Sequence, residues 1–270
     1  MSLKGKNLGL RTVSGAVLGV VVVGAALLSK WAFAVVAAVV TVGVVWELLR
    51  MVRTKEGVEP QNLVATALGV ALVVECALSG SPVALLTLLL LFPVVFIVEL
   101  ARGKNRPLEN VAATLMAVVY GAVPMALMVC MGQRGGEWEP AWVLAVVMTV
   151  WVNDIFAYLV GCSIGRHKMC PSISPKKSWE GFAGGVVFAV AFAMAAGYML
   201  EGNVIAWGGL GAVVALGGVV GDLVESMFKR ECGLKDSGNL IPGHGGMLDR
   251  FDALLISAPL AYVYMLICGL

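Results

Sequence analysis

The sequence predicts an all-α integral membrane protein with about nine transmembrane helices, the N-terminus inside and the C-terminus outside. Composition, the lengths of the apolar stretches and the distribution of basic residues predict this fold. Of the 270 residues, 60% are hydrophobic and 13% are charged, and mean hydropathy is +0.92. Soluble domains are about 45–50% apolar and about 25% charged. The composition therefore excludes an ordinary soluble domain. The net charge of +2 says nothing by itself about a nucleic-acid partner, and we expect none.

Nine apolar stretches are long enough to cross a bilayer, which requires about 20 residues in a helix. Their backbone amides must be satisfied within each segment, so we expect helices and not strands. The first stretch follows Lys4 and Lys6, but it has no small-residue cleavage site and runs into a second span, so we expect a retained helix. The predicted spans are 12–28, 31–49, 62–79, 82–100, 108–131, 140–161, 180–200, 203–225 and 250–269.

Basic residues fall on alternate loops of this arrangement. With the N-terminus inside, every Lys and Arg lies on the inner side except Lys30 and Arg134. Positive charge gathers in cytoplasmic loops, so this asymmetry predicts the orientation. It also supports the number of spans, because one span more or fewer would disturb the alternation.

Acidic residues within or beside a span are costly and indicate function by default. Glu47, Glu75 and Glu99 each lie alone near a predicted helix end, where we expect the carboxylates of Glu47 and Glu99 to snorkel to the cytoplasmic surface. We expect Arg50 and Arg53 to be ordinary anchors on that surface. The second half of the chain differs, because its polar residues are clustered.

Two short acidic helix faces are predicted in that second half. Asp222, Glu225 and Ser226 are three and four residues apart, and Asp249 and Asp252 are three apart at a helix N-terminus. Carboxylate oxygens suit Mg²⁺, which shares its coordination with substrate phosphates. The sequence therefore predicts a Mg²⁺ site whose ligands are Asp222, Asp249, Glu225 and Asp252, and four carboxylates leave room for a second cation.

Cations close to these acidic residues can hold phosphates, Arg by bidentate contact and Lys as a point charge. Two alternatives stay open: Asp249 can be a helix N-cap, and the basic residues can be anchors on anionic lipid. His244 can be a turn residue, a phosphate contact or an acid–base group. The cations concerned are Lys176, Lys177, Lys229, Arg230, Lys235 and Arg250.

The stretch from Ser226 to Asp252 resembles the signature of the phosphatidate cytidylyltransferase (CDP-diacylglycerol synthase) family. Its matching residues are Ser226, Lys229-Arg230, Lys235-Asp236, Gly238, Ile241-Pro242, His244-Gly245-Gly246 and Asp249-Arg250-Phe251-Asp252. The segments Asn153-Asp154 and Ser174–Gly181 also resemble this family, so the likeness covers about residues 150–255. A pattern with so many fixed positions is specific.

The resemblance implies a nucleotidyltransferase in which phosphatidic acid attacks the α-phosphorus of CTP and pyrophosphate leaves. The predicted spans place about five membrane helices in 1–139 and about four in a catalytic membrane region with cytoplasmic loops in 140–270. We expect the protein in the inner (cytoplasmic) membrane. A homodimer stays open. The catalytic residues implied are Lys229, Arg230, Lys235, Asp236, His244 and Arg250. The substrate-binding residues implied are Asn153, Asp154, Ser174, Lys176, Lys177, Glu180, Ser226, Gly245 and Gly246.

An ion-coupled membrane transporter is the main alternative. Carriers bind near the bilayer midplane, whereas the polar residues here cluster at predicted cytoplasmic helix ends, and Asn153-Asp154 is the one pair deep enough for a carrier. A CDP-alcohol phosphotransferase would carry an Asp-Gly-x-x-Ala-Arg segment, which the sequence lacks. A membrane scaffold would not need acidic residues on two helix ends.

Overall fold

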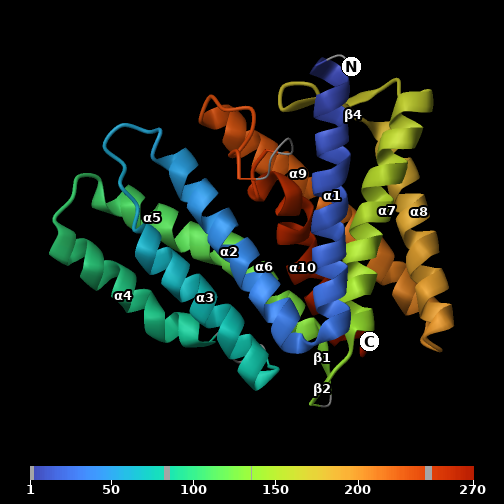
Figure 1. Ribbon diagram of the computed structural model, residues 1–270, viewed down its shortest axis with the longest axis horizontal. Helices are drawn as coiled ribbons and strands as arrows, with labels where there is room; N and C mark the ends of the chain where they lie inside the picture. Colours follow the sequence, from blue (N-terminus) through green and yellow to red (C-terminus); the bar gives the residue numbers. More distant parts are fainter. Residues whose placement is uncertain (1–2, 82–85, 135, 241–244) are drawn as a thin grey trace. The chain divides into compact units, whose positions relative to one another are not determined.

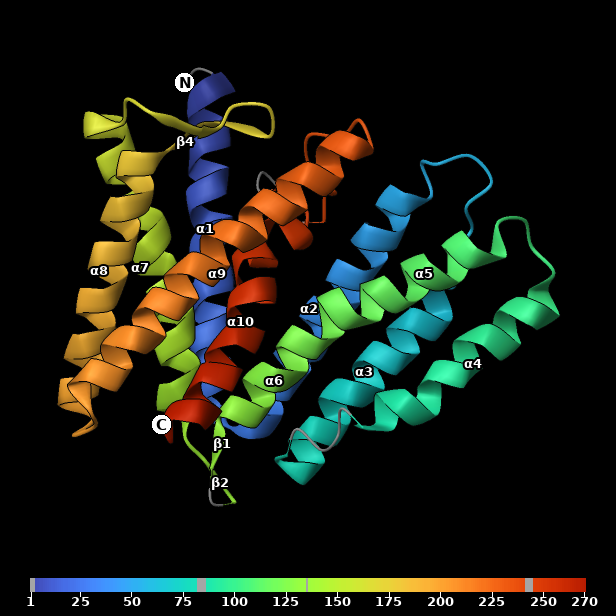
Figure 2. The ribbon, with the colours of Figure 1, turned by 180° about the vertical axis from the view of Figure 1, so that it is seen from behind.

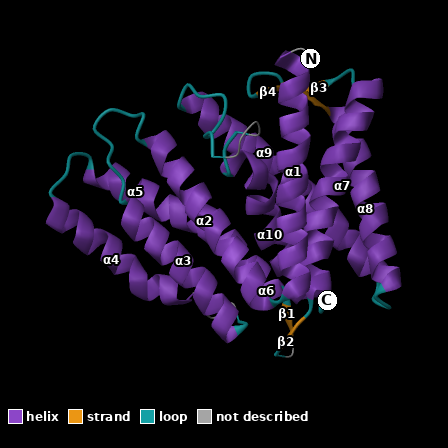
Figure 3. Ribbon diagram, in the orientation of Figure 1, coloured by secondary structure: helices purple, strands orange, loops and turns teal. Residues whose placement is uncertain are grey.

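The computed structural model describes residues 3–81, 86–134, 136–240 and 245–270, and these residues are mostly helical (Figures 1 and 3). The all-α prediction is confirmed. The helices are α1 (Leu3–Leu28), α2 (Lys30–Val52), α3 (Asn62–Ser79), α4 (Thr87–Arg102), α5 (Pro107–Ala117), the π-helix η2 (Val118–Ala122), α6 (Val123–Met131), α7 (Pro140–Ile164), α8 (Trp179–Met199), α9 (Val204–Glu231) and α10 (Leu248–Cys268).

Seven helical segments of the described chain are long and apolar enough to cross a membrane. They are α2, α3, the continuous segment Pro107–Met131, α7, α8, α9 and α10. Helix α1 contains a shorter apolar stretch, Val13–Leu28. The predicted span 82–100 lies partly outside the described residues, and its described part is α4. The chain is therefore a multi-pass membrane protein, and the count of nine spans stays a prediction.

The chain divides into two compact units. The first unit contains residues 1–140 and 231–251, and the second contains residues 141–230 and 252–270. The described residues of segment 231–251, which include most of the signature positions, thus pack with the N-terminal helices.

Within the first unit, α2 packs against α1, α3 and α6, and α4 packs against α5 (Figures 1 and 2). The apolar side chains of Val44, Val45 and Leu49 on α2 are fully buried. Ser29 caps α2, because its side chain accepts a hydrogen bond from the backbone N–H of Ala32. A short hairpin of β1 (Gln133–Arg134) and β2 (Glu137–Trp138) precedes α7.

The expectation that Glu47 and Glu99 snorkel to the surface is wrong. Only 1% of Glu47 and 4% of Glu99 is exposed. Glu99 Oε2 accepts hydrogen bonds from Gln61 Nε2 and Arg102 Nη1, each at 2.8 Å, and Glu99 Oε1 accepts one from Asn110 Nδ2 at 2.6 Å. Because Gln61, Arg102 and Asn110 satisfy the Glu99 carboxylate inside the protein, this side chain need not reach water.

The second unit contains α7, α8, α9 and the part of α10 from Asp252 onward. Before α8, the segment predicted as a loop forms an antiparallel hairpin of β3 (Lys168–Cys170) and β4 (Ser174–Ser178) (Figure 3). Ser178 then caps α8 by accepting from the N–H of Gly181 at 3.2 Å. Helices α9 and α10 approach closely at Gly221, where an added Cβ would collide with the Asp252 backbone. Small residues allow such contacts in membrane proteins.

Candidate active site

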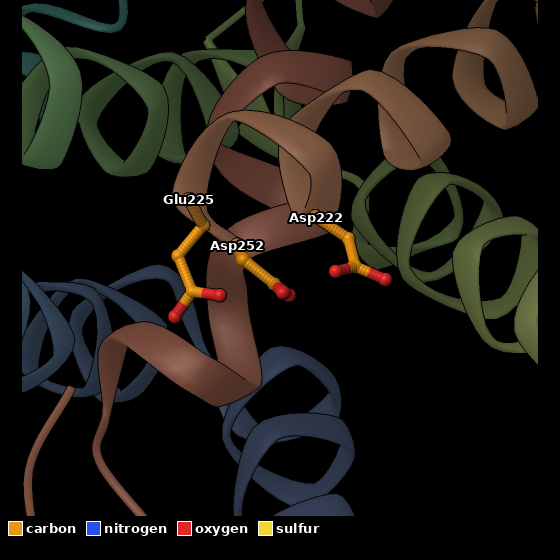
Figure 4. A group of neighbouring side chains, drawn as sticks. All are labelled: Asp222, Glu225 and Asp252. Carbon is orange, nitrogen blue, oxygen red and sulfur yellow. The ribbon is translucent and has the colours of Figure 1, made fainter. Parts of the chain in front are cut away.

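Three carboxylates of the second unit come together at the close approach of α9 and α10. Asp222 and Glu225 project from one face of α9, and Asp252 projects from α10 between them (Figure 4). One oxygen from each residue lies within 4.8 Å of the others. We call Asp222, Glu225 and Asp252 the acidic cluster. The three-residue spacing on α9 and the missing side chain at Gly221 explain how the fold assembles it.

The acidic cluster fits a hard divalent cation. The oxygen ligands of one Mg²⁺ lie about 3–4 Å apart when each is about 2.1 Å from the ion. The spacing in the cluster is close to this, so small side-chain rotations would allow three oxygens to share one ion. Glu225 is fully buried, and Asp222 and Asp252 are partly buried. Three carboxylates at this separation repel one another unless cations compensate them.

Two lysines supply part of that compensation. Lys177 Nζ on β4 lies 2.7 Å from Asp222 Oδ2, and Lys229 Nζ lies 2.5 Å from Glu225 Oε2 one helical turn along α9. Lys229 is only 8% exposed, whereas Arg230 is exposed. Ser226 Oγ donates to Asp222 Oδ1 at 3.3 Å. Ser226 and Lys229, both predicted as site residues, are thus joined to the acidic cluster.

Asn153 and Asp154 on α7 lie close to the same group. Asn153 is buried, and its Nδ2 donates to Asp154 Oδ1 at 3.3 Å. Asp154 interacts electrostatically with Asp222 and Lys177, and Asp252 interacts with Asp154. The structure therefore brings Asp154, which the resemblance implies as a substrate contact, to the edge of the acidic cluster.

Other predicted residues of the second unit lie on or beside the hairpin. Glu180 accepts hydrogen bonds from the backbone N–H groups of Arg166 and His167, and its Oε1 lies 2.5 Å from His167 Nδ1. Glu180 thus fixes the turn between α7 and β3. Ser174 pairs with Cys170 across the hairpin, and Lys176 is exposed next to Lys177.

Asp249 belongs to the first unit and has a different environment. Its Oδ2 accepts hydrogen bonds from Ser237 N at 3.0 Å, from Ser237 Oγ at 3.0 Å and from Gly246 N at 2.8 Å. Gly245 precedes Gly246 with a φ of 85°, a conformation that glycine adopts readily. The predicted metal role of Asp249 stays a prediction. Arg250 is exposed in the first turn of α10, and His244 lies outside the described residues.

The first unit also contains a cavity of about 430 Å³ between the end of α2 and segment 234–239. Lys235 and Asp236, both predicted as catalytic, line it together with Arg50 and Arg53, which were predicted to be surface anchors. Lys55 beside this region pairs with Glu231, and the hydrogen bond to that carboxylate raises the pKa of the Lys55 ammonium. Arg50, Arg53 and Lys235 thus give this cavity three cationic side chains.

Sequence reasoning missed Glu47 and Ser237. Glu47 Oε2 accepts from Ser237 Oγ at 3.0 Å and from the backbone N–H of Leu248 at 2.8 Å. An acidic residue inside an apolar helix was the available signal, because such residues indicate function by default. Ser237 lies between matching signature positions, and nothing in the sequence indicated a role for it.

Comparison with known proteins agrees with the resemblance carried by these residues. The profile of the cytidylyltransferase family matches residues 9–268. The chain belongs to this family. The match to the family profile therefore covers the N-terminal helices as well as the acidic cluster. It extends the resemblance that the sequence shows over about residues 150–255.

Curated relatives of this cytidylyltransferase family member carry a more specific name. The phosphatidate cytidylyltransferase of Mycobacterium bovis is 39% identical over 171 residues, which cover 61% of this chain and 54% of the relative. The phosphatidate cytidylyltransferase of Staphylococcus aureus is 38% identical over 167 residues, which cover 61% of this chain and 63% of the relative. The matches thus span less than two thirds of these relatives. They support the enzyme prediction and give no support to the transporter alternative.

Proposed function

We propose that the protein is a phosphatidate cytidylyltransferase. A phosphate oxygen of phosphatidic acid attacks the α-phosphorus of CTP, a new P–O bond forms, and the bond from the α-phosphorus to the bridging oxygen breaks. Pyrophosphate leaves with that oxygen, and the products are CDP-diacylglycerol and pyrophosphate. The observation that carries this proposal is the acidic cluster, three carboxylates flanked by two lysines in a membrane protein of the cytidylyltransferase family.

The side chains of the cluster suit a reaction between two anions. Phosphoryl-type transfer needs alignment and charge neutralisation more than covalent help. Asp222, Glu225 and Asp252 would hold Mg²⁺, which when bound offsets phosphate charge and orients phosphate oxygens. Lys177 and Lys229 compensate the carboxylates, and each ammonium can turn part of its hydrogen bonding toward a substrate phosphate. A second cation near Asp154 or Asp249 is part of the proposal.

We also propose nine transmembrane spans with the N-terminus on the cytoplasmic side of the inner membrane. The alternation of basic loops supports this orientation. It would give CTP access from the cytosol, while phosphatidic acid reaches the site from the bilayer with its acyl chains still in hydrocarbon.

The direct test uses purified protein, labelled CTP, Mg²⁺ and vesicles that contain phosphatidic acid. We expect a lipid-soluble cytidine nucleotide that forms only when phosphatidic acid and Mg²⁺ are both present. Chelation should stop its formation, and added Mg²⁺ should restore it. If the protein is folded and no lipid-soluble cytidine nucleotide forms under any of these conditions, the proposed reaction is excluded.

A further inference from the structure

Glu47 is a buried carboxylate to which distant parts of the first unit are attached. It lies near the end of α2, and only 1% of the residue is exposed. Its Oε2 accepts hydrogen bonds from Ser237 Oγ and from Leu248 N, which lie 190 and 201 positions further along the sequence. Burying a carboxylate is costly unless hydrogen bonds compensate it, so these two bonds tie segment 231–251 to α2.

The backbone approaches this carboxylate closely at Gly238 and Gly246. A Cβ added to Gly238 would lie 2.9 Å from Glu47 Cδ, and one added to Gly246 would lie 2.7 Å from it. Both distances are shorter than a normal contact, so only glycine fits at either position without movement. Residues 237–238 and 246–248 therefore lie directly against the carboxylate.

The same contacts lead to Asp249. Ser237 Oγ is 3.0 Å from Glu47 Oε2 and 3.0 Å from Asp249 Oδ2. The N–H of Gly246, which lies against Glu47, donates to Asp249 Oδ2 at 2.8 Å. Whatever fixes Ser237 and Gly246 therefore also fixes the carboxylate of Asp249.

We propose that Glu47 is a positioning residue that holds residues 237–238 and 246–248 in place. Through these residues it orients Asp249 and the segment 234–239, which lines the cavity next to the end of α2. The expected effect on enzyme kinetics rests on the proposed function. Asp249 is a predicted metal ligand, and Lys235 and Asp236, which line the cavity, are predicted catalytic residues. Groups that orient metal ligands through hydrogen bonds commonly change activity or metal affinity by about 10–100-fold when they are removed.

Two substitutions of Glu47 separate positioning from simple filling of space. Glu47→Ala removes both acceptor bonds. Glu47→Gln keeps both bonds, because its amide oxygen can take the place of Oε2. Its amide nitrogen then takes the place of Oε1, which has no hydrogen-bond partner among the described residues. Ser237→Ala, a smaller change, cuts only the link through the hydroxyl. Glu99→Ala is the matched control, because Glu99 is a similarly enclosed carboxylate of the first unit whose partners are Gln61, Arg102 and Asn110.

The test measures hydrogen exchange of peptides covering 234–251 together with steady-state kinetics on the full protein. For Glu47→Ala we expect exchange at Gly246 and Leu248 to rise about tenfold and kcat to fall about 10–100-fold, with the required Mg²⁺ concentration raised. Ser237→Ala should also raise amide exchange and lower kcat, but by less. For Glu47→Gln, exchange and kcat should stay within about threefold of the values for the unsubstituted protein. Glu99→Ala should leave exchange in 234–251 unchanged.

Equal exchange in 234–251 for Glu47→Ala and Glu99→Ala would overturn the inference, as would Glu47→Gln behaving like Glu47→Ala. If Glu47→Ala does not fold, Ser237→Ala and Glu47→Gln decide, and unchanged exchange and kinetics in Ser237→Ala would overturn it too. Should the unsubstituted protein make no CDP-diacylglycerol, the proposed function fails, but the exchange measurement still decides whether Glu47 holds the segment.

Discussion

Lys177 Nζ on β4 lies 2.7 Å from Asp222 Oδ2 on α9, an ion pair between the β3–β4 hairpin and the acidic cluster. Lys176, its neighbour on the same strand, is exposed. Successive side chains of a strand point to opposite faces, which explains why only one of the two lysines reaches the cluster. The sequence pattern groups these lysines together, and the hairpin separates them.

Lys177→Ala should therefore reduce turnover far more than Lys176→Ala. Removing Lys177 deprives Asp222 of its cation and takes away a charge close to the proposed phosphate site, and a charge-assisted contact is worth about 1.5–3 kcal/mol, or about 10–150-fold. Lys176→Ala serves as the control and should stay within about threefold. Steady-state kinetics with CTP and phosphatidic acid varied separately would measure both. Equal effects of the two substitutions would contradict the role drawn from the ion pair.

Asp222→Asn and Asp252→Asn should each abolish nearly all activity and raise the Mg²⁺ concentration needed for what remains. Each keeps the size of the side chain but replaces one charged oxygen ligand, which Mg²⁺ binds much more strongly than an amide. Glu109→Gln is a suitable control, because Glu109 pairs with Arg106 at an exposed helix start. A Mg²⁺ titration of activity checks the prediction. Normal turnover with a normal Mg²⁺ requirement in either variant would remove that residue from the metal site.

Lys229 and Arg230 are adjacent, but their replacement by alanine should have different effects on the stability of the protein. Lys229→Ala leaves the buried carboxylate of Glu225 without its ion-pair partner, and breaking a buried pair destabilises proteins by about 3–5 kcal/mol. Arg230→Ala removes an exposed side chain and should leave the melting temperature within about 2 °C. Thermal unfolding in detergent, compared with kinetics, distinguishes them. If the double variant Glu225→Gln, Lys229→Met is no more stable than Lys229→Ala, the role assigned to the ion pair is wrong.

Much of the fold follows from physics that acts along the chain. An apolar run of about 20 residues in a bilayer must satisfy its own backbone, so helix positions such as α7 and α9 were predictable, as was the shared face of Asp222 and Glu225. Partners between distant segments were not predictable. Glu47 resembled a residue free to reach the surface, because nothing nearby in the sequence indicates that Ser237 and Leu248 would enclose it. The hairpin at 168–178 was missed for the same reason, since its pairing depends on tertiary context.

The proposed orientation can be tested with single cysteines in a variant that lacks the six native ones. Cysteines at Asn105, Ser172 and Asn239, which are all exposed, should react with an impermeant thiol reagent only from the cytoplasmic side. One at Glu137 should react only from the opposite side. Labelling in right-side-out and inverted vesicles makes the comparison. Reaction of the Asn239 position from the outside would contradict both the orientation and access of CTP from the cytosol.

The most direct measurement of the proposed reaction follows the two ends of the triphosphate. Purified protein would be incubated with phosphatidic acid vesicles, Mg²⁺ and CTP labelled either at the α-phosphorus or at the γ-phosphorus, with Asp222→Asn treated in parallel. We predict that the α-label enters the lipid phase and the γ-label appears in pyrophosphate in equal amounts, and that Asp222→Asn yields neither product while remaining folded. Release of the γ-label as inorganic phosphate without labelled lipid, or labelled lipid that forms equally well with Asp222→Asn, would contradict the proposed reaction and its metal site.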